Sequence, residues 1–429
     1  MRSWGFESPS SHHEAPLRIP HPNSSHPVRP PLVKLPAAAA RAVVLGRLAK
    51  LSSGRLCLQE NGAAISFGDA APGSSGQPIF EPTITVNDPR FFLRVALRGS
   101  IGAADSYTRG EWDCDDLVEL TRLLAANEQG IETRPGAAAA LVRGIRRLQP
   151  AAGKLRSRRN VAKHYDLGND FFALFLDPGL SYSCLIFDSP TTSLKEAAQA
   201  KLERACDKLE LKAGQRLLDL GCGWGALSLY AAEQRQVQVT AVTVSEKQAN
   251  YLAARVQARG LGDLVTVKRS DYRDLRDSHD AVASIEMIEA VGARNYGGLF
   301  ACYRDRLRPG GRLFLQAITI EDALYDEYRY RPDFIRQRIF PGGCLPSLRV
   351  IKREARDAGL LLEETTDIGR HYVTTLAHWR QRFTANQQRL SELGYDRALQ
   401  RSWLMYLSYC EAGFAEGRIS DLQLCLRRR

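Results

Sequence analysis

The chain has 429 residues and a formal net charge of +11, and 44% of its residues are hydrophobic while 25% are charged. This composition excludes a disordered or fibrous protein, and the length predicts two or three domains. No window approaches about 18 uninterrupted apolar residues, so we expect no membrane span. The first residues, MRSWGFESPSSHHE, lack the apolar core of a secretory signal, and we therefore expect a cytoplasmic protein.

The net charge indicates the kind of partner, and the cysteine pattern indicates the state of the thiols. An excess of basic residues favours anionic partners, either nucleic acid or the head groups of acidic lipids, without choosing between them. The nine cysteines are scattered without a C-x-x-C pair, so we expect mostly reduced thiols and no metal site.

The chain begins with a segment rich in Pro, Ser and His. Residues 1–35 show no apolar periodicity, which predicts a disordered extension. Residues 36–135 contain short alternating runs interrupted by Gly and by Asn-Asp-Pro, a pattern typical of a small domain with strands and turns.

A basic stretch follows, and we expect residues 136–159 to link two domains. The run from Leu141 to Lys163 contains eight basic residues and no acidic one. Two interpretations stay open: a solvated connector, or a surface that binds anionic lipid at about 1 kcal/mol per basic residue. Pro150 divides the run, which excludes one long basic helix.

Residues 160–429 alternate between helical and strand patterns. Apolar residues in 192–211 recur at helical spacing, and Ser193 with Glu196 fits a capping box. Short apolar runs recur at 216–220, 239–244, 264–267, 281–285 and 312–318. This alternation predicts a doubly wound, Rossmann-like α/β sheet that binds its ligand at the carboxyl ends of the strands, beside the smaller N-terminal α+β domain.

The run RLLDLGCGWGA, residues 216–226, predicts a strand, a glycine turn and the start of a helix. Gly221 and Gly223 lack a Cβ atom, so a ligand can approach the backbone closely, and the helix start offers free N–H groups. The loop also satisfies the loose dinucleotide pattern G-x-G-x-x-G/A, so NAD is an alternative. Asp219 before the turn, and the lack of an acidic residue directly after the second strand, favour S-adenosylmethionine.

Seven motifs follow one another between about Asn160 and the C-terminus: NVAKHYDLGNDFFALFLDPGLSYSC, LLDLGCGWGALSLYAA, VTVSEKQANY, SIEMIEAVGARNY, RIFPGGCLPS, HYVTTLAHW and YCEAGFAEGRI. In this order they resemble the cyclopropane fatty acid synthase family of S-adenosylmethionine-dependent methyltransferases, which includes the mycolic acid cyclopropane synthases. The small domain before them is similar to the N-terminal domain of the phospholipid-acting members, through weaker motifs such as SYTRGEWDCDDL.

The resemblance implies a cofactor site built from several segments. Tyr182 and Ser183 would contact the methionine part of the cofactor above the glycine loop, while Asp271 and Tyr272 would lie near the adenine. The full set of implied cofactor-binding residues is Tyr182, Ser183, Gly221, Cys222, Gly223, Thr243, Val244, Ser245, Glu246, Lys247, Gln248, Asp271, Tyr272 and Ile285.

The resemblance also implies a bicarbonate ion beside the reacting carbon. The groups that would hold the ion match Cys184, Glu289, Gln316, Ile318 and Tyr372. Several members have His where this chain has Gln316, and Gln can donate a hydrogen bond but cannot carry a proton.

The chemistry explains why such groups are needed. Attack of a cis double bond on a sulfonium methyl leaves a carbocation, which needs an apolar pocket and a nearby anion, and a base must then remove a proton. Glu289, just past the fourth strand, can hold bicarbonate through a shared proton. Tyr372 can donate to the same ion or serve in packing, and the thiols of Cys184 and Cys410 are open between chemistry and packing. The implied catalytic residues are therefore Cys410, Glu289, Tyr372 and Cys184.

We therefore expect transfer of a methyl(ene) group from S-adenosylmethionine to the cis double bond of an unsaturated phospholipid acyl chain, which gives a cyclopropane chain. The alternatives are methylation without ring closure, a small-molecule amine methyltransferase of the same fold, and a degenerate lipid-binding protein without activity. Phe171, Phe172 and Phe175 can wall the acyl pocket or belong to the ordinary core. We expect peripheral association with the inner face of the membrane and no nucleic-acid partner, and a homodimer stays open.

Overall fold

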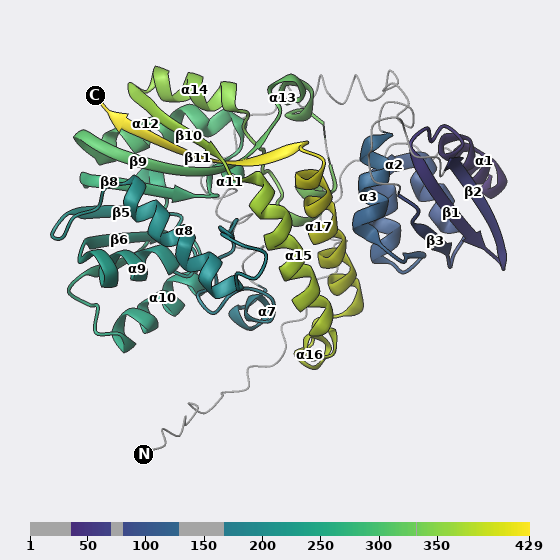
Figure 1. Ribbon diagram of the computed structural model, residues 1–429, viewed down its shortest axis with the longest axis horizontal. Helices are drawn as coiled ribbons and strands as arrows, with labels where there is room; N and C mark the ends of the chain where they lie inside the picture. The colour runs from purple at the N-terminus through teal and green to yellow at the C-terminus, as the bar shows by residue number, and fades with distance from the viewer. Residues whose placement is uncertain (1–35, 70–79, 128–166, 332) are drawn as a thin grey trace, which may run out of the picture.

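The computed structural model describes residues 36–69, 80–127, 167–331 and 333–429 (Figure 1). The predicted extension, residues 1–35, and the predicted linker, residues 136–159, lie outside the described residues. Within the described part of the chain, no helix is long and apolar enough to cross a membrane.

A small α+β unit comes first in the chain. Its elements are α1 (Ala37–Leu48), β1 (Gly54–Glu60), β2 (Ala63–Asp69), β3 (Thr83–Val86), α2 (Arg90–Thr108), β4 (Trp112–Cys114) and α3 (Leu117–Ala126). The strands form one sheet in the order β2-β1-β3-β4. Between β1 and β2 the chain turns at Asn61 and Gly62, whose φ angles of 52° and 80° suit the tight turn of a hairpin. This agrees with the predicted small domain of strands and turns.

A seven-stranded sheet forms the centre of the rest of the chain (Figure 1). Its strands are β5 (Arg216–Leu220), β6 (Gln238–Thr243), β7 (Val265–Arg269), β8 (His279–Ile285), β9 (Leu307–Ile320), β10 (Leu360–Asp367) and β11 (Ile419–Arg428). They lie in the order β10-β11-β9-β8-β5-β6-β7. Neighbours among β5 to β9 are parallel, whereas β11 pairs antiparallel with β9 and β10. The predicted doubly wound sheet is confirmed.

The five predicted apolar runs are the five parallel strands, whereas β10 and β11 were not predicted. Strand β10 is mostly exposed at the edge of the sheet and has a polar sequence, LLLEETTD. Strand β11 is buried but interrupts its apolar run with Asp421 and Gln423. Neither strand therefore shows the uninterrupted apolar run that marks the parallel strands.

Helices flank the large sheet, and α8, α10 and α17 begin with a polar side-chain cap. They are α7 (Asn169–Ala173), α8 (Leu194–Lys208), α9 (Ala226–Arg235), α10 (Glu246–Ala258), α11 (Ile288–Val291), α12 (Tyr296–Arg306), α13 (Asp322–Tyr328), α14 (Leu348–Asp357), α15 (Gly369–Ala385), α16 (Gln387–Glu392) and α17 (Arg397–Ala415). Residues 272–274 and 293–295 form 3₁₀ turns, and residues 335–339 form a π-helical turn. The predicted capping box is confirmed: Ser193 Oγ accepts from the Glu196 N–H, and the Glu196 carboxylate accepts from the Ser193 N–H.

An aromatic cluster packs α7 against α15 and α17. The Phe171 ring lies 4.9 Å from the Trp403 ring and 5.9 Å from the Phe383 ring, centroid to centroid. Phe171, Phe172 and Phe175 are fully buried in this cluster. Of the two interpretations of the FFALFL segment, the structure favours the ordinary core.

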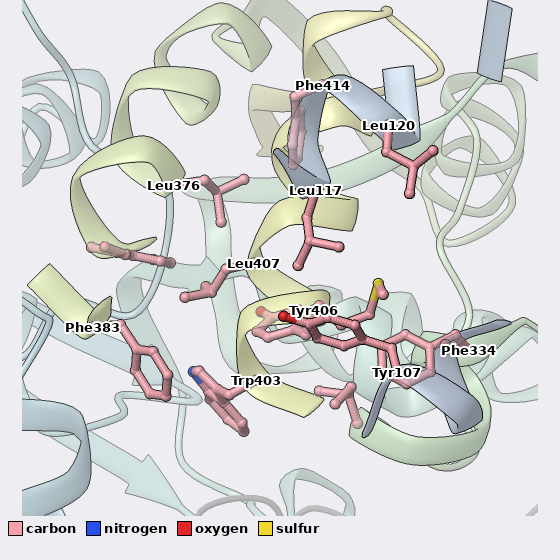
Figure 2. Close-up of a cluster of buried hydrophobic side chains, with 14 of the residues drawn as sticks. Tyr107, Leu117, Leu120, Phe334, Leu376, Phe383, Trp403, Tyr406, Leu407 and Phe414 are labelled. Carbon is pink, nitrogen blue, oxygen red and sulfur yellow. The ribbon is translucent and has the colours of Figure 1, made fainter. Parts of the chain in front are cut away.

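Helix α17 also packs against the small unit. Figure 2 shows Trp403, Tyr406 and Leu407 of α17 between side chains of two groups of elements. Leu376 and Phe383 come from α15 on one side, and Tyr107, Leu117 and Leu120 come from α2 and α3 of the small unit on the other. The small unit therefore shares one apolar core with helices α7, α15 and α17.

Arg401 on α17 stabilises the contact between α17 and the small unit through charge-assisted hydrogen bonds. Its guanidinium donates to the backbone oxygens of Tyr107 and Trp112 and to the Asp113 carboxylate at 2.5 to 2.6 Å. It also lies 3.9 Å above the centre of the Tyr107 ring. The Arg401 side chain is only 11% exposed, so water screens these contacts little.

We predict that Arg401→Ala lowers the free energy of unfolding by about 2 kcal/mol, because hydrogen bonds from a charged donor are lost and two carbonyls lose their partner. Urea titration followed by circular dichroism measures the change. Arg389→Ala is the matched control, because Arg389 forms an exposed pair with Glu392, and we expect a change below about 0.5 kcal/mol. Equal effects of the two substitutions would contradict this role of Arg401.

Candidate active site

A cavity opens at the carboxyl ends of β5, β6 and β8, at the edge of the sheet where the sequence predicts ligand binding. It encloses about 1260 Å³ including its opening to solvent. Eleven of the fourteen predicted cofactor residues line it: Tyr182, Ser183, Gly221, Cys222, Gly223, Thr243, Val244, Gln248, Asp271, Tyr272 and Ile285. Segments far apart in the sequence thus meet at the switch point between β5 and β8.

The glycine turn forms the floor of this cavity. Gly221 has a φ of 83°, and a Cβ atom there would lie 2.8 Å from the Met287 side chain. Gly223 also has a positive φ, and a Cβ atom there would meet open space rather than protein within 4 Å. Helix α9 begins after Gly225 without a side-chain cap, and Ala226 and Leu227 of its first turn line the cavity, whereas the Ser228 N–H is already bound to Asp219. This helix start can therefore offer N–H groups to a ligand.

Asp219 supplies a buried carboxyl group at the end of β5. Its Oδ2 accepts a hydrogen bond of 2.6 Å from Ser228 Oγ, and the side chain is 3% exposed. Burial raises the pKa of Asp219 to about 6, against the opposing hydrogen bond from Ser228. Asp219 therefore titrates close to neutral pH at the cavity wall.

Three residues of the segment after β6 line the cavity. Thr243 Oγ1 donates to Gln248 Oε1 at 2.7 Å, and both residues line the cavity together with Val244. Ser245, Glu246 and Lys247 belong to the start of α10 instead. Ser245 caps that helix, and Glu246 is exposed and paired with Arg269. These three residues are not among those that line the cavity, and their contact with the cofactor stays a prediction.

Polar side chains in two further segments of the cavity wall, residues 182–183 and 271–272, already form hydrogen bonds within the protein. Asp271 accepts two hydrogen bonds from the Arg273 guanidinium at 2.7 and 2.8 Å. The Tyr182 hydroxyl donates to the Tyr406 hydroxyl at 3.0 Å. Lys201 Nζ donates to Ser183 Oγ at 2.5 Å, and Lys201 is 2% exposed. Burial lowers the pKa of Lys201, while the nearby Glu286 and Asp177 carboxyl groups oppose that shift.

Glu286 is the residue that the sequence analysis missed. It follows β8 directly and lies on the cavity wall. Its Oε1 accepts from the Cys184 N–H at 2.7 Å and from Gln316 Nε2 at 2.9 Å. Its Oε2 accepts from the Tyr372 hydroxyl at 2.7 Å. The argument that pointed to Glu289, a carboxyl group just past the fourth strand, applies more closely to Glu286 and could have found it.

The predicted bicarbonate-binding residues lie together around this carboxylate. Cys184 takes part through its backbone N–H, whereas its thiol donates to backbone carbonyls and burial raises the pKa of that thiol. Glu289 is not among the residues that line the cavity, and its Oε1 accepts a hydrogen bond of 2.6 Å from the Ile318 N–H. Tyr372 is buried behind Glu286 with its ring stacked on Phe414 at 4.4 Å.

A third carboxyl group completes the cluster. Asp421 of β11 accepts from Gln316 Nε2 at 2.9 Å, so the Gln316 amide contacts both Asp421 and Glu286. Burial, followed by the charges of Glu286 and Glu289, raises the pKa of Asp421 well above its usual range. Burial, followed by the charge of Glu286, raises the pKa of Glu289 to about 8.

Cys410 lies apart from this cluster. It is partly buried on α17, against the aromatic core, and burial raises the pKa of its thiol well above the usual range. A thiol in such a position carries little thiolate. Its catalytic role stays a prediction. Among the described residues, no group of three or more His, Cys, Asp or Glu side chains is arranged to hold a metal ion.

Comparisons with known proteins show which family this chain resembles. The sequence model of the mycolic acid cyclopropane synthetase family matches residues 153–424. Tuberculostearic acid methyltransferase UfaA1 of Mycobacterium tuberculosis is 34% identical over 403 residues, 92% of this chain and 93% of that protein. Cyclopropane-fatty-acyl-phospholipid synthase of Escherichia coli is 36% identical over 342 residues, 80% of this chain and 86% of that protein.

Solved structures show the same fold. Mycolic acid cyclopropane synthase CmaA1, complexed with SAH and CTAB, aligns with a TM-score of 0.60 at 32% identity and covers 63% of this chain and 98% of its own. Coclaurine N-methyltransferase, bound to N-methylheliamine and SAH, aligns with a TM-score of 0.60 at 24% identity, which supports the fold alone.

The carboxyl cluster predicts how stability responds to pH. Glu289 has a pKa near 8 in the folded protein and an ordinary value of 4.5, so its proton stabilises the fold below pH 4.5 and that contribution is lost as pH rises through 8. We predict that Glu289→Gln, which keeps the shape but cannot ionise, gains stability relative to the parent by up to about 1.4 kcal/mol per pH unit between pH 5 and 8.

Urea unfolding of both proteins at several pH values measures this difference. Glu392→Gln is the control, because Glu392 is exposed and paired with Arg389, and its difference from the parent should stay nearly constant over that range. A Glu289→Gln difference that does not change with pH would contradict the protonated state of Glu289.

Proposed function

The chain belongs to the mycolic acid cyclopropane synthetase family and is an S-adenosylmethionine-dependent methyltransferase, and we propose that it builds a cyclopropane ring on an unsaturated phospholipid acyl chain. In this reaction a methyl(ene) group is added across a cis double bond. S-adenosylmethionine, when bound, supplies an electrophilic methyl group on a sulfonium sulfur.

We propose that the cavity above the glycine turn holds S-adenosylmethionine. The absence of a Cβ atom at Gly223 leaves room for close approach, and the start of α9 offers N–H groups to a carboxylate. Asp219 is placed to receive the ammonium group of the methionine part, and the hydroxyl and amide of Thr243 and Gln248 are placed to receive the ribose. The fit of these donor and acceptor groups supports the assignment.

The observation that carries the proposal is the cluster of buried carboxyl groups behind the cofactor cavity. Glu286 lies on the cavity wall itself, with Glu289 and Asp421 behind it. In a low-dielectric interior a fixed anion stabilises a nearby positive charge much more strongly than it does in water. A reaction through a carbocation needs such an anion, whereas methylation of an amine does not.

The surroundings of the cavity suit a hydrocarbon chain. Tyr182 and Trp224 on the wall pack against Phe172 with tilted rings, and the ring centroids are 5.2 and 4.8 Å from that of Phe172. This apolar side keeps water away from a cationic carbon. The choice of a phospholipid rests on the Escherichia coli relative and on the net charge of +11, which favours docking on anionic lipid at the inner face of the membrane.

Methylation without ring closure is a second candidate. The relative named tuberculostearic acid methyltransferase aligns with 92% of this chain, so the alignment includes the small α+β unit. Ring closure and simple methylation pass through the same cation and differ in which proton is then removed. A lipid-binding protein that had lost its activity would not need a cofactor site, so the intact glycine turn and cavity disfavour this alternative.

The experiment incubates the purified protein with methyl-labelled S-adenosylmethionine and vesicles of an unsaturated, anionic phospholipid. Mass spectrometry of the released acyl chains should show the mass of one added CH₂. A cyclopropane and a methylated alkene are isomers, so catalytic hydrogenation under mild conditions separates them: the alkene takes up hydrogen and the ring does not. A methylated alkene would favour methylation without ring closure over cyclopropane formation. Acyl chains without label would contradict both functions.

A further prediction concerns the cofactor site. Asp219 has a pKa near 6 without ligand, and only its ionised form attracts the ammonium group, so affinity should fall as pH drops through 6. We predict that the dissociation constant of S-adenosylhomocysteine rises about tenfold between pH 7.5 and pH 5. Calorimetric titration measures it.

Asp219→Asn is the matched variant for this titration. It should bind more weakly than the parent at pH 7.5 and lose most of the pH dependence, because the amide does not titrate in this range. A pH dependence as steep in the variant as in the parent would assign the effect to another group.

A further inference from the structure

The hydrogen-bond donors that the family resemblance assigns to a bicarbonate ion are already bound in this protein. The Cys184 N–H, Gln316 Nε2 and the Tyr372 hydroxyl all donate to Glu286, and the Ile318 N–H donates to Glu289. A separate anion would have to displace a side-chain carboxylate from every one of these donors. The arrangement therefore does not fit the predicted bicarbonate ion.

The donors are oriented toward Glu286 by their own neighbours. Gln423 Nε2 donates to Gln316 Oε1 at 3.1 Å, which turns the NH₂ group of Gln316 toward Glu286 and Asp421. The Tyr372 ring is held by stacking on Phe414 and by an edge contact with Trp379. The site is thus prepared for one carboxylate at one position.

The backbone at Glu286 supports the same conclusion. Its φ of 48° lies in the left-handed region, which favours glycine and is unfavourable for a residue with a long side chain. Such a conformation is found where the surrounding structure holds the residue in place for a purpose. Here the conformation turns the Glu286 carboxylate from the end of β8 into the ring of donors.

The charges of the cluster favour an ionised Glu286. Burial raises the pKa of Glu286, but Tyr372, Lys201, the Cys184 N–H and Gln316 all oppose that shift. Asp421 and Glu289 receive fewer hydrogen bonds, and each has one carboxyl oxygen without a partner among the described residues. Of the three carboxyl groups, Glu286 is the one best able to carry the negative charge.

We propose that the Glu286 carboxylate takes the place of bicarbonate, as a built-in anion that stabilises the cationic carbon and accepts the proton released from the new methyl group. This proposal rests on the proposed function. The alkene electron pair forms the bond to the transferred carbon, the sulfur keeps the pair of the broken bond, and the neighbouring chain carbon becomes cationic. Loss of a proton to Glu286 leaves the C–H pair to close the ring, and the carboxylate becomes a carboxylic acid that later returns its proton to solvent.

The first test measures bicarbonate binding and does not need the acyl substrate. The chain bound to S-adenosylhomocysteine is titrated with ¹³C-bicarbonate and followed by NMR. We expect no specific binding to the parent. Glu286→Gly suits the backbone and frees the donors, so it should bind the ion. Glu286→Gln keeps the site filled with an amide and should not bind it. Binding to the parent as tight as to Glu286→Gly would overturn the proposal.

The second test measures turnover in buffer freed of carbon dioxide. The parent should keep its rate, and added bicarbonate should not raise it. Glu286→Gly and Glu286→Gln should each lose at least about a hundredfold, and bicarbonate or formate should restore only the glycine variant. Retained binding of S-adenosylhomocysteine shows that the variants are folded.

The two proposals fail in different ways. A parent that makes no methylated lipid with any unsaturated phospholipid contradicts the proposed function. A parent that needs bicarbonate for turnover, or a Glu286→Gln variant as fast as the parent, contradicts the role of Glu286 while leaving the methyltransferase function in place.

Discussion

An ionised carboxylate persists in an apolar interior only where hydrogen-bond donors and a nearby cation surround it, and the position of Glu286 meets that condition. Three donors from three segments bind its two oxygens, and the buried Lys201 ammonium favours its charge. The carboxyl groups of Asp421 and Glu289, whose pKa values are raised by burial and by the charge of Glu286, complete the cluster. The proposed chemistry depends on this arrangement. A cationic carbon needs a nearby anion in a site without water, and here hydrogen-bond donors of the protein solvate that anion in place of water.

The fold explains how such a cluster forms. The end of β8 carries Glu286 to the edge of the cofactor cavity, while β9 and β11 carry Gln316 and Asp421 to adjacent positions. Helix α15 places Tyr372 above them, and α17 holds α15 against the small unit through the shared apolar core. Polar residues in the middle of the buried strand β11, which look unfavourable in isolation, belong to this network.

The sequence predicted the parts of the structure that depend on local patterns. The five parallel strands, the α8 capping box and the glycine turn each have a signal within a few neighbouring residues. Strand β11 escaped prediction because Asp421 and Gln423 interrupt its apolar run, and their partners lie on β9, more than a hundred residues away. Glu286 was missed because the resemblance pointed to Glu289, three residues on, and only the folded chain shows which carboxyl group the donors bind. Ser245, Glu246 and Lys247 belong to a motif that continues into the start of α10, and their contact with the cofactor stays a prediction.

The charge state of Glu286 is the central claim, and the ¹³C chemical shift of its side-chain carboxyl carbon measures that state directly. Protein labelled at the glutamate Cδ and bound to S-adenosylhomocysteine should show, at pH 7, one buried carboxylate resonance that is absent from the Glu286→Gln variant. A resonance at the shift of a protonated carboxyl group, assigned to Glu286 by the same comparison, would contradict the account.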